Sequence, residues 1–216
     1  MLSDASAKTQ EKETGRIEAF SDGVFAIALT LLVLDIKVPE LEKVELTSLA
    51  TELIHSWPNI VAFAASFFFV LVMWINHHRL FTVIRRADNN LMLLNGLLLF
   101  GVTLVPFPTA VVADFVGTRD AVTAVLVYNG WFFIVAIFFN LLWWYAAARY
   151  RLFDDLPNKN LSSHISRQYM LGPFAYLVGI LLAFIHPYLG LAVNVGMAVF
   201  FAIPNKAVQE MIDANS

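Results

Sequence analysis

Cysteine is absent from the 216 residues, and charged residues are scarce at 14%. A chain without cysteine forms no disulfide and no thiolate metal site, and it has no thiol nucleophile. Soluble domains carry about a quarter charged residues, whereas 59% of this chain is hydrophobic and 19 of its residues are phenylalanine. The net charge of -3 also disfavours a nucleic-acid partner. These deficits exclude an ordinary soluble domain and predict an integral membrane protein that is surrounded by the lipid bilayer.

The sequence motifs of common enzymes are also missing. There is no HExxH, no GxSxG and no glycine-rich phosphate loop, and no pair of acids lies deep in an apolar run. The TVGYG filter of ordinary potassium channels is absent as well. The first sixteen residues are polar and lack the apolar stretch of a cleavable signal peptide. We therefore expect a polar tail at residues 1–15, and we expect no catalytic residue, metal ion or bound cofactor.

Uncharged runs place the helices, because about 20 apolar residues cross a hydrocarbon core of roughly 30 Å. The runs that fit one crossing each are 53–78, 89–113 and 121–148. The run 168–205 is too long for one helix, and it is interrupted by His186-Pro187, where the proline removes a backbone donor. This run therefore predicts two short helices, near 168–185 and 188–204.

The first span, Ile17–Ile36, has helical length but contains Glu18 and Asp22. A helix with such charges should not face lipid along its whole length. With this span included, the sequence predicts an all-α polytopic membrane protein whose six transmembrane helices occupy residues 16–206. Residues 207–216 form a C-terminal tail.

Lysine and arginine are divided unevenly between the predicted loops. Eleven lie in the N-terminal tail, in alternate loops and at the C-terminus, against three on the opposite side. Because cytoplasmic segments carry the excess of positive charge, both termini and the loops at 79–88 and 149–167 are predicted to be cytoplasmic. An even number of spans is required, as in a six-span, multi-pass protein of the cell membrane.

The first helix carries different residues on its two faces. At 100° per residue, an apolar stripe forms around Ile27. The stripe consists of Phe20, Ile27, Leu31 and Leu34, with Arg16 and Gly23 in line and Thr30 beside it. Asp22 falls about 140° away from Ile27, so we expect it to point into the bundle of its own subunit. Ionisable groups at membrane depth tend to pair or to face water, which makes Asp22 a functional candidate; the alternative is a shallow position in the headgroup layer.

Trp74, His77 and His78 lie at i, i+3 and i+4 near the end of the second span and are therefore neighbours on one helix. The charge distribution puts this end on the same side of the membrane as Asp22. A contact of Asp22 with the Trp74 indole or with His77 is thus geometrically available. Zinc needs three or four ligands, which two adjacent histidines do not supply. Structural or interfacial histidines are the alternative interpretation.

The segment Arg16–Gly23 reads R-I-E-A-F-S-D-G and resembles the R-x-x-x-F-S-D signature of the transmembrane protein 175 family of potassium channels. The signature residues are Arg16, Phe20, Ser21 and Asp22. The W-x-x-H-H of the second span supports the resemblance, and the length and six-span layout extend it over nearly the whole chain. Family members of this size look like the bacterial type, in which four six-helix subunits surround one pore. The resemblance therefore implies a homotetramer whose first helix lines a central pore.

The resemblance also implies roles for individual residues. The pore constriction maps to Ile27, Leu31 and Leu34, with Thr30 as a neighbour that can reach the lumen. A polar network that holds the first helix in place maps to Arg16, Asp22, Trp74, His77 and His78. The expected function is a potassium-preferring cation channel with K⁺ as the permeant ion and a hydrophobic constriction in place of a carbonyl filter.

Two other functions stay open on the residues alone. A secondary or proton-coupled transporter often has helices interrupted by glycine or proline near the midplane, and the third span contains Gly96, Gly101, Pro106 and Pro108. A membrane enzyme could use Asp22, His77 and His78, but no nucleophile or metal set joins them. Unitary conductance would separate a pore from both alternatives.

Overall fold

The computed structural model describes residues 2–36, 38–39, 44, 48–148, 152 and 159–203, and the side chains of all of these except 2–13, 35, 159–162 and 164. Throughout this part of the chain the regular structure is helical. The elements are α1 (Leu2–Leu31), η1 (Leu32–Asp35), α3 (Leu49–His55), α4 (Trp57–Val83), α5 (Asn89–Thr103), α6 (Pro106–Phe115), α7 (Ala121–Ala148), α8 (Lys159–Ala183) and α9 (Pro187–Ala202). The predicted all-α class is confirmed.

Among the residues that the structure describes, four segments are long and apolar enough to cross a membrane. They are Thr14–Leu34, Trp57–Val83, Asn89–Phe115 and Ala121–Ala148. α9 is apolar but has only 16 residues. It begins at Pro187, as the His186-Pro187 pair predicts, because proline at the first helical position has no N–H that needs a partner.

Residues 2–15, expected as a polar tail, are helical and continue α1. Thr14 Oγ1 donates a hydrogen bond of 2.6 Å to the carbonyl oxygen of Arg85, in the loop after α4. The backbone N–H groups of Arg85 and Arg86 donate to the carbonyl of Leu152, at 3.0 and 3.1 Å. The N-terminal part of α1 and the segments that follow α4 and α7 therefore meet at one end of the bundle. Residues 207–216 and most of the loop 149–158 lie outside the described residues.

The third span is interrupted between α5 and α6. Val105 N–H donates to the carbonyl of Val102, three residues back, and not to the residue four positions back as in an α-helix. This tight turn comes directly before Pro106, which has no N–H to donate. The Trp131 indole N–H of α7 donates to the Gly101 carbonyl at 2.8 Å. A backbone acceptor at membrane depth is thus satisfied by a side chain of the neighbouring helix, as a dry environment requires.

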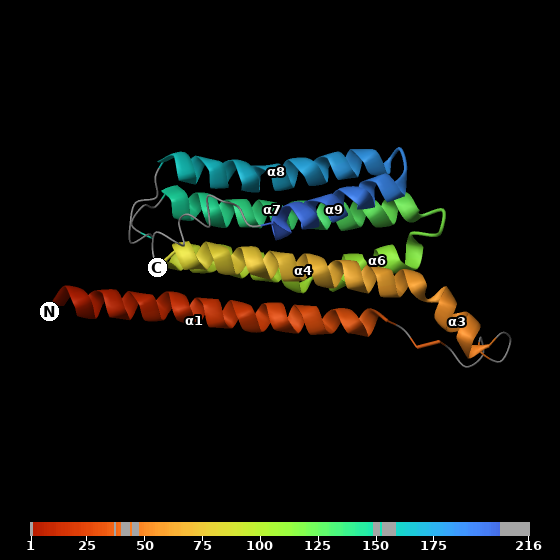
Figure 1. The fold of residues 1–216 in the computed structure, drawn as a ribbon, viewed down its shortest axis with the longest axis horizontal. Coiled ribbons are helices and arrows are strands. Elements are labelled where there is room, and N and C mark those ends of the chain that lie inside the picture. The colour runs from red at the N-terminus through yellow and green to blue at the C-terminus, as the bar shows by residue number, and fades with distance from the viewer. Residues whose placement is uncertain are drawn as a thin grey trace.

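The helices form a layered bundle in which α1 and α8 lie on opposite sides (Figure 1). α1 contacts α4 and α5, while α8 contacts α7 and α9. The middle of the bundle is filled by large buried side chains, among them Leu98, Phe132 and Trp143. α1 is therefore attached along one face only, which leaves its other face at the surface of the subunit.

Candidate functional site

The two faces of α1, and of the short η1 that continues it, differ sharply in exposure. Ser21, Phe25, Ala28 and Leu32 are at most 1% exposed and face the bundle. On the opposite face, the predicted stripe residues Phe20, Ile27, Leu31 and Leu34 are 67%, 59%, 41% and 71% exposed, and Arg16 and Thr30 are exposed as well. Large apolar side chains in an exposed row are typical of a surface that another molecule or lipid covers.

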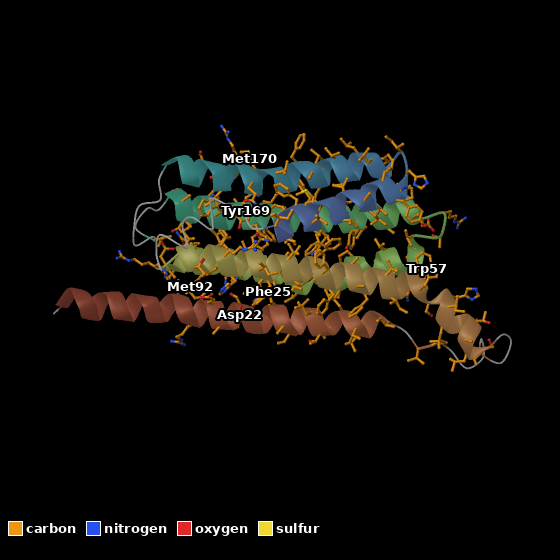
Figure 2. The ribbon with its side chains drawn as sticks, viewed as in Figure 1. Asp22, Phe25, Trp57, Met92, Tyr169 and Met170 are labelled. Carbon is orange, nitrogen blue, oxygen red and sulfur yellow. The ribbon has the colours of Figure 1, made fainter. Side chains whose placement is uncertain are left out.

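Asp22 lies on the inward side and is bound by the second span. Its Oδ1 accepts a 2.7 Å hydrogen bond from the indole N–H of Trp74. Figure 2 shows Asp22 and Phe25 on α1, next to the rest of the bundle. The bond has a charged acceptor, and such bonds are roughly twice as strong as neutral ones.

A second contact between α1 and α4 lies one turn away. Nδ1 of His78 is 2.7 Å from Oε1 of Glu18 on α1, and the His78 ring stacks on that of Trp74 with centroids 6.1 Å apart. Trp74 and His78 therefore act together on α1, one through Asp22 and the other through Glu18.

A buried chain of hydrogen bonds joins α1, α4 and α5. Ser21 Oγ donates to the Ile17 carbonyl at 2.8 Å, and Asn95 Nδ2 donates to Ser21 Oγ at 2.9 Å. Asn95 Oδ1 is 2.8 Å from His77 Nε2. Because an amide oxygen only accepts, His77 Nε2 carries the proton and donates. The chain thus links three helices and selects one neutral tautomer of His77.

His77 is enclosed by aromatic rings. Its ring lies 5.3 Å from that of Phe25 on α1 and 4.6 Å from that of Phe81, measured between centroids. Its Nδ1 has no hydrogen-bond partner among the described residues. The histidine is therefore a buried structural element that packs on the inward face of α1.

The structure brings Asp22, Trp74, His77 and His78 together at one level of the α1–α4 contact. Arg16 is exposed, and no contact among the described residues joins it to this cluster. Glu18 and Asn95 complete the cluster but were not predicted. The signal for Asn95 was an amide within the apolar part of the third span, one turn past Leu91, since a buried polar group needs a partner.

In the part of the chain that the structure describes, no three His, Cys, Asp or Glu side chains come together as a metal site would require. The cluster holds its members through directional hydrogen bonds between helices. These bonds join the inward face of α1 to α4 and α5, opposite the exposed stripe.

Known proteins resemble this chain in sequence. A family model described as the endosomal/lysosomal potassium channel TMEM175 matches residues 16–106. A potassium channel of Chamaesiphon minutus is 47% identical over 198 residues, which cover 92% of this chain and 98% of that protein. A potassium channel of Streptomyces collinus is 38% identical over 190 residues, which cover 88% and 91%.

The fold agrees with this likeness. The crystal structure of a lysosomal potassium-selective channel TMEM175 homologue from Chamaesiphon minutus superimposes with a TM-score of 0.81 at 47% sequence identity. The match covers 89% of this chain and 97% of the other. The likeness therefore extends over most of the length of both chains.

Proposed function

We propose a cation pore lined by the first helix, on the premise that the chain belongs to the TMEM175 family of potassium channels. Family membership makes the chain a potassium channel and not an enzyme. The observation that supports a pore-lining role is the exposed apolar row on α1. This row lies opposite the face on which Asp22 and Ser21 bind the rest of the bundle. A helix that is held in one rotation presents the same side chains from every subunit.

Six spans per subunit are the proposed arrangement, with the apolar second half of α8 and the short α9 as the last two. Both termini are then cytoplasmic. The meeting of Thr14, Arg85 and Leu152 at one end supports this orientation, because the tail and the loops rich in arginine share that end.

Cysteine labelling tests the orientation, since the chain has no cysteine of its own. An impermeant thiol reagent outside intact cells is expected to label Arg119→Cys but not Arg85→Cys. The Arg119 side chain is 95% exposed at the opposite end, which makes it the matched control. Labelling of Arg85→Cys from outside would reverse the orientation.

The proposed oligomer is a homotetramer, the number that the family resemblance implies. Four copies of α1 around one axis would face each other through Ile27, Leu31 and Leu34. This assembly covers the apolar row that a single subunit leaves exposed. Thr30 Oγ1 donates to the Ile27 carbonyl at 2.9 Å, so its proton is engaged and only its lone pairs are available to an ion.

Selectivity in such a constriction comes from the cost of dehydration. A ring of Ile27 side chains offers no oxygen ligands, so a cation that passes sheds water without full replacement. Na⁺ holds its water more tightly than K⁺, and the ring therefore favours K⁺, though less strongly than a carbonyl filter does. Each tenfold preference corresponds to about 1.4 kcal/mol.

Ile27→Asn tests the constriction, because polar atoms at the narrowest point replace part of the lost hydration. Expected are larger currents and a K⁺ to Na⁺ permeability ratio closer to one, measured as the bi-ionic reversal potential of reconstituted protein. Leu181→Asn on α8 is the control, because Leu181 is 60% exposed against 59% for Ile27 but lies on the other side of the bundle. Unchanged selectivity and conductance in Ile27→Asn would place the filter elsewhere.

The interruption between α5 and α6 favours a second candidate, a secondary or proton-coupled transporter with a broken third span. Single-channel recording separates the two. A pore gives unitary current steps far above the turnover of a carrier, whereas a transporter gives none.

A further inference from the structure

An open groove of about 530 Å³ runs along the surface of α8. Its lining consists of Phe133 of α7 and of Arg167, Met170, Leu171, Pro173, Phe174 and Leu177 of α8. The first members of the α8 set follow each other at i, i+3, i+4 and i+7, so they share one face of that helix. α8 and α1 lie on opposite sides of the bundle (Figure 1), which makes this groove and the exposed row on α1 separate surfaces.

At the level of the groove, α8 is attached closely to α7. Pro173 has no N–H, so the Tyr169 carbonyl receives no helical hydrogen bond from it. Asn140 Nδ2 of α7 donates to that carbonyl at 2.8 Å. A Cβ at Gly172 would lie 3.4 Å from the Cβ of Ala136 on α7, which shows how near the two helices are. The groove therefore borders a close helix contact, and its lining residues belong to helices and not to a loop.

Most of the groove is apolar and exposed. Met170 and Phe174 are 57% and 65% exposed, whereas Tyr169, next to Met170 in the chain, is buried. Figure 2 shows Met170 on the outer side of α8 and Tyr169 on the side of α7. A contiguous apolar surface of this kind marks a contact with another protein or with the membrane.

The proposed pore decides between these two covers, and the inference rests on that proposed function. Four copies of α1 around one axis place α8, on the opposite side of each bundle, at the outside of the assembly (Figure 1). The groove then faces the bilayer, and lipid covers it. The remaining question is which lipid its side chains select.

Arg167 provides the charge at one end of the groove. Its side chain is exposed, and no ion pair or hydrogen bond engages it in the part of the chain that the structure describes. It directly precedes the uncharged run 168–205, and the proposed orientation therefore puts it at the cytoplasmic headgroup level. A guanidinium group binds phosphate oxygens through parallel N–H groups. The groove thus carries a phosphate-binding group at the level where phospholipids have their phosphate.

The length of the groove fits one leaflet of the bilayer. Arg167 and Leu177 are ten positions apart, which is about 15 Å at 1.5 Å per residue. Half of a hydrocarbon core of roughly 30 Å has the same length. An acyl chain that hangs from a phosphate on Arg167 therefore follows the apolar wall as far as the midplane.

We propose that this groove binds an anionic phospholipid of the cytoplasmic leaflet, with its phosphate on Arg167 and one acyl chain along Phe174 and Phe133. A free phosphate ion would leave the apolar wall uncovered, and a chain without a headgroup would leave Arg167 without a counter-charge. A zwitterionic phospholipid brings its own cationic group close to Arg167, which weakens its binding. A headgroup with net negative charge satisfies both ends of the groove.

The test is photolabelling of the full-length protein in phosphatidylcholine vesicles. The probe is a trace of phosphatidylglycerol with a diazirine on its acyl chain, and labelled residues are located by mass spectrometry. Unlabelled phosphatidylglycerol is compared as a competitor with phosphatidylethanolamine, which has the same phosphate but no net charge. Phosphatidylglycerol is expected to displace the label from the groove at about fivefold lower mole fraction, as one arginine near an anionic headgroup predicts.

Two pairs of variants locate the site. Arg167→Gln is expected to abolish the preference between the competitors, whereas Arg119→Gln makes the same charge change at the opposite end of the bundle and keeps it. Phe174→Asn places a polar group in the apolar wall and is expected to lower labelling of the groove about fivefold. Leu181→Asn, on the same helix but outside the groove, has a similarly exposed position and should leave the labelling unchanged.

Equal displacement by the two competitors in the wild type would overturn the proposal, because any phospholipid would then fill the groove. A preference that survives Arg167→Gln would also overturn it, since the selecting charge would lie elsewhere. Absence of label from the groove would assign it to a neighbouring subunit, with the same consequence. Failure of the proposed pore has a different signature, because the probe would then label Ile27 and Leu31 on α1, which an assembled pore keeps away from lipid.

Discussion

The first helix and the last described helix are held to the same bundle by different means. α1 is bound through side-chain hydrogen bonds, such as those from Trp74 to Asp22 and from Asn95 to Ser21. α9 also has side-chain hydrogen bonds to the bundle, such as that from Asn194 Nδ2 to Asn129 Oδ1, but it adds a close backbone approach, with Gly190 against α8. Close approach fixes how near two helices lie, whereas hydrogen bonds to set partners also fix rotation about the helix axis. The second means suits α1, because its opposite face carries the exposed row.

The contact of α9 is the easiest to break. A Cβ at Gly190 would lie 2.9 Å from the Gly179 carbonyl oxygen, 2.9 Å from Val125 Cγ1 and 3.0 Å from Ala183 Cβ. Gly190→Val is therefore expected to lower stability by about 3 kcal/mol, because neither backbone nor branched side chain can yield. The measurement is the thermal midpoint at which purified protein leaves its size-exclusion peak.

Gly196 provides the matched control on the same helix. A Cβ added there meets nothing within 4 Å, so Gly196→Val should leave the midpoint close to that of the wild type. If both variants lose the same stability, the loss comes from replacing a glycine by valine within α9 and not from the contact of Gly190 with α8.

Loss of the hydrogen bond between Asp22 and Trp74 is expected to have the second-largest effect on stability. Asp22→Ala removes the acceptor and leaves the Trp74 indole N–H without its partner, which should cost about 2 kcal/mol. Asp22→Asn keeps an acceptor oxygen and should lose about half as much. Both are measured by the thermal midpoint and by the yield of oligomer.

A double-mutant cycle with Trp74→Phe assigns the effect to the bond. The loss in the double variant should be smaller than the sum of the two single losses, because both changes remove one interaction. Strictly additive losses would mean that Asp22 acts through another neighbour.

Part of this arrangement followed from the sequence, for identifiable reasons. The inward direction of Asp22 follows from helical periodicity alone, and the spacing of Trp74 and His78 places their rings one turn apart. The helix break at His186-Pro187 follows from the missing donor of proline.

The partners across helices could not be obtained in the same way. Asn76, Asn95, Asn129, Asn140 and Asn194 are each at most 7% exposed, yet none interrupts an apolar run when only ionised residues are counted. A buried amide needs a hydrogen-bond partner, but the sequence does not indicate which residue provides it. That choice depends on helix packing, as does the approach of Gly190 to Gly179, which no local pattern encodes.

Ser21 tests how much the buried hydrogen bonds on the inward face of α1 contribute to stability. Its hydroxyl donates to the Ile17 carbonyl and accepts from Asn95 Nδ2. Ser21→Ala leaves that amide N–H unsatisfied in a buried position and should cost about 1.5 kcal/mol. A thermal midpoint equal to that of the wild type would show that the buried chain contributes nothing to the attachment of α1.

Thr30 is the counterpart of Ser21 on the exposed face and carries the smallest expected effect. Its hydroxyl donates to the Ile27 carbonyl at 2.9 Å, a back-bond like that of Ser21, but its side chain is exposed. Thr30→Val keeps the shape and removes the hydroxyl, and it should change stability by no more than about 0.5 kcal/mol, because no buried group loses a partner. The same thermal midpoint measures it beside Ser21→Ala. A loss as large as that of Ser21→Ala would mean that the outward face of α1 is also part of the folded core, which would contradict its assignment to the pore.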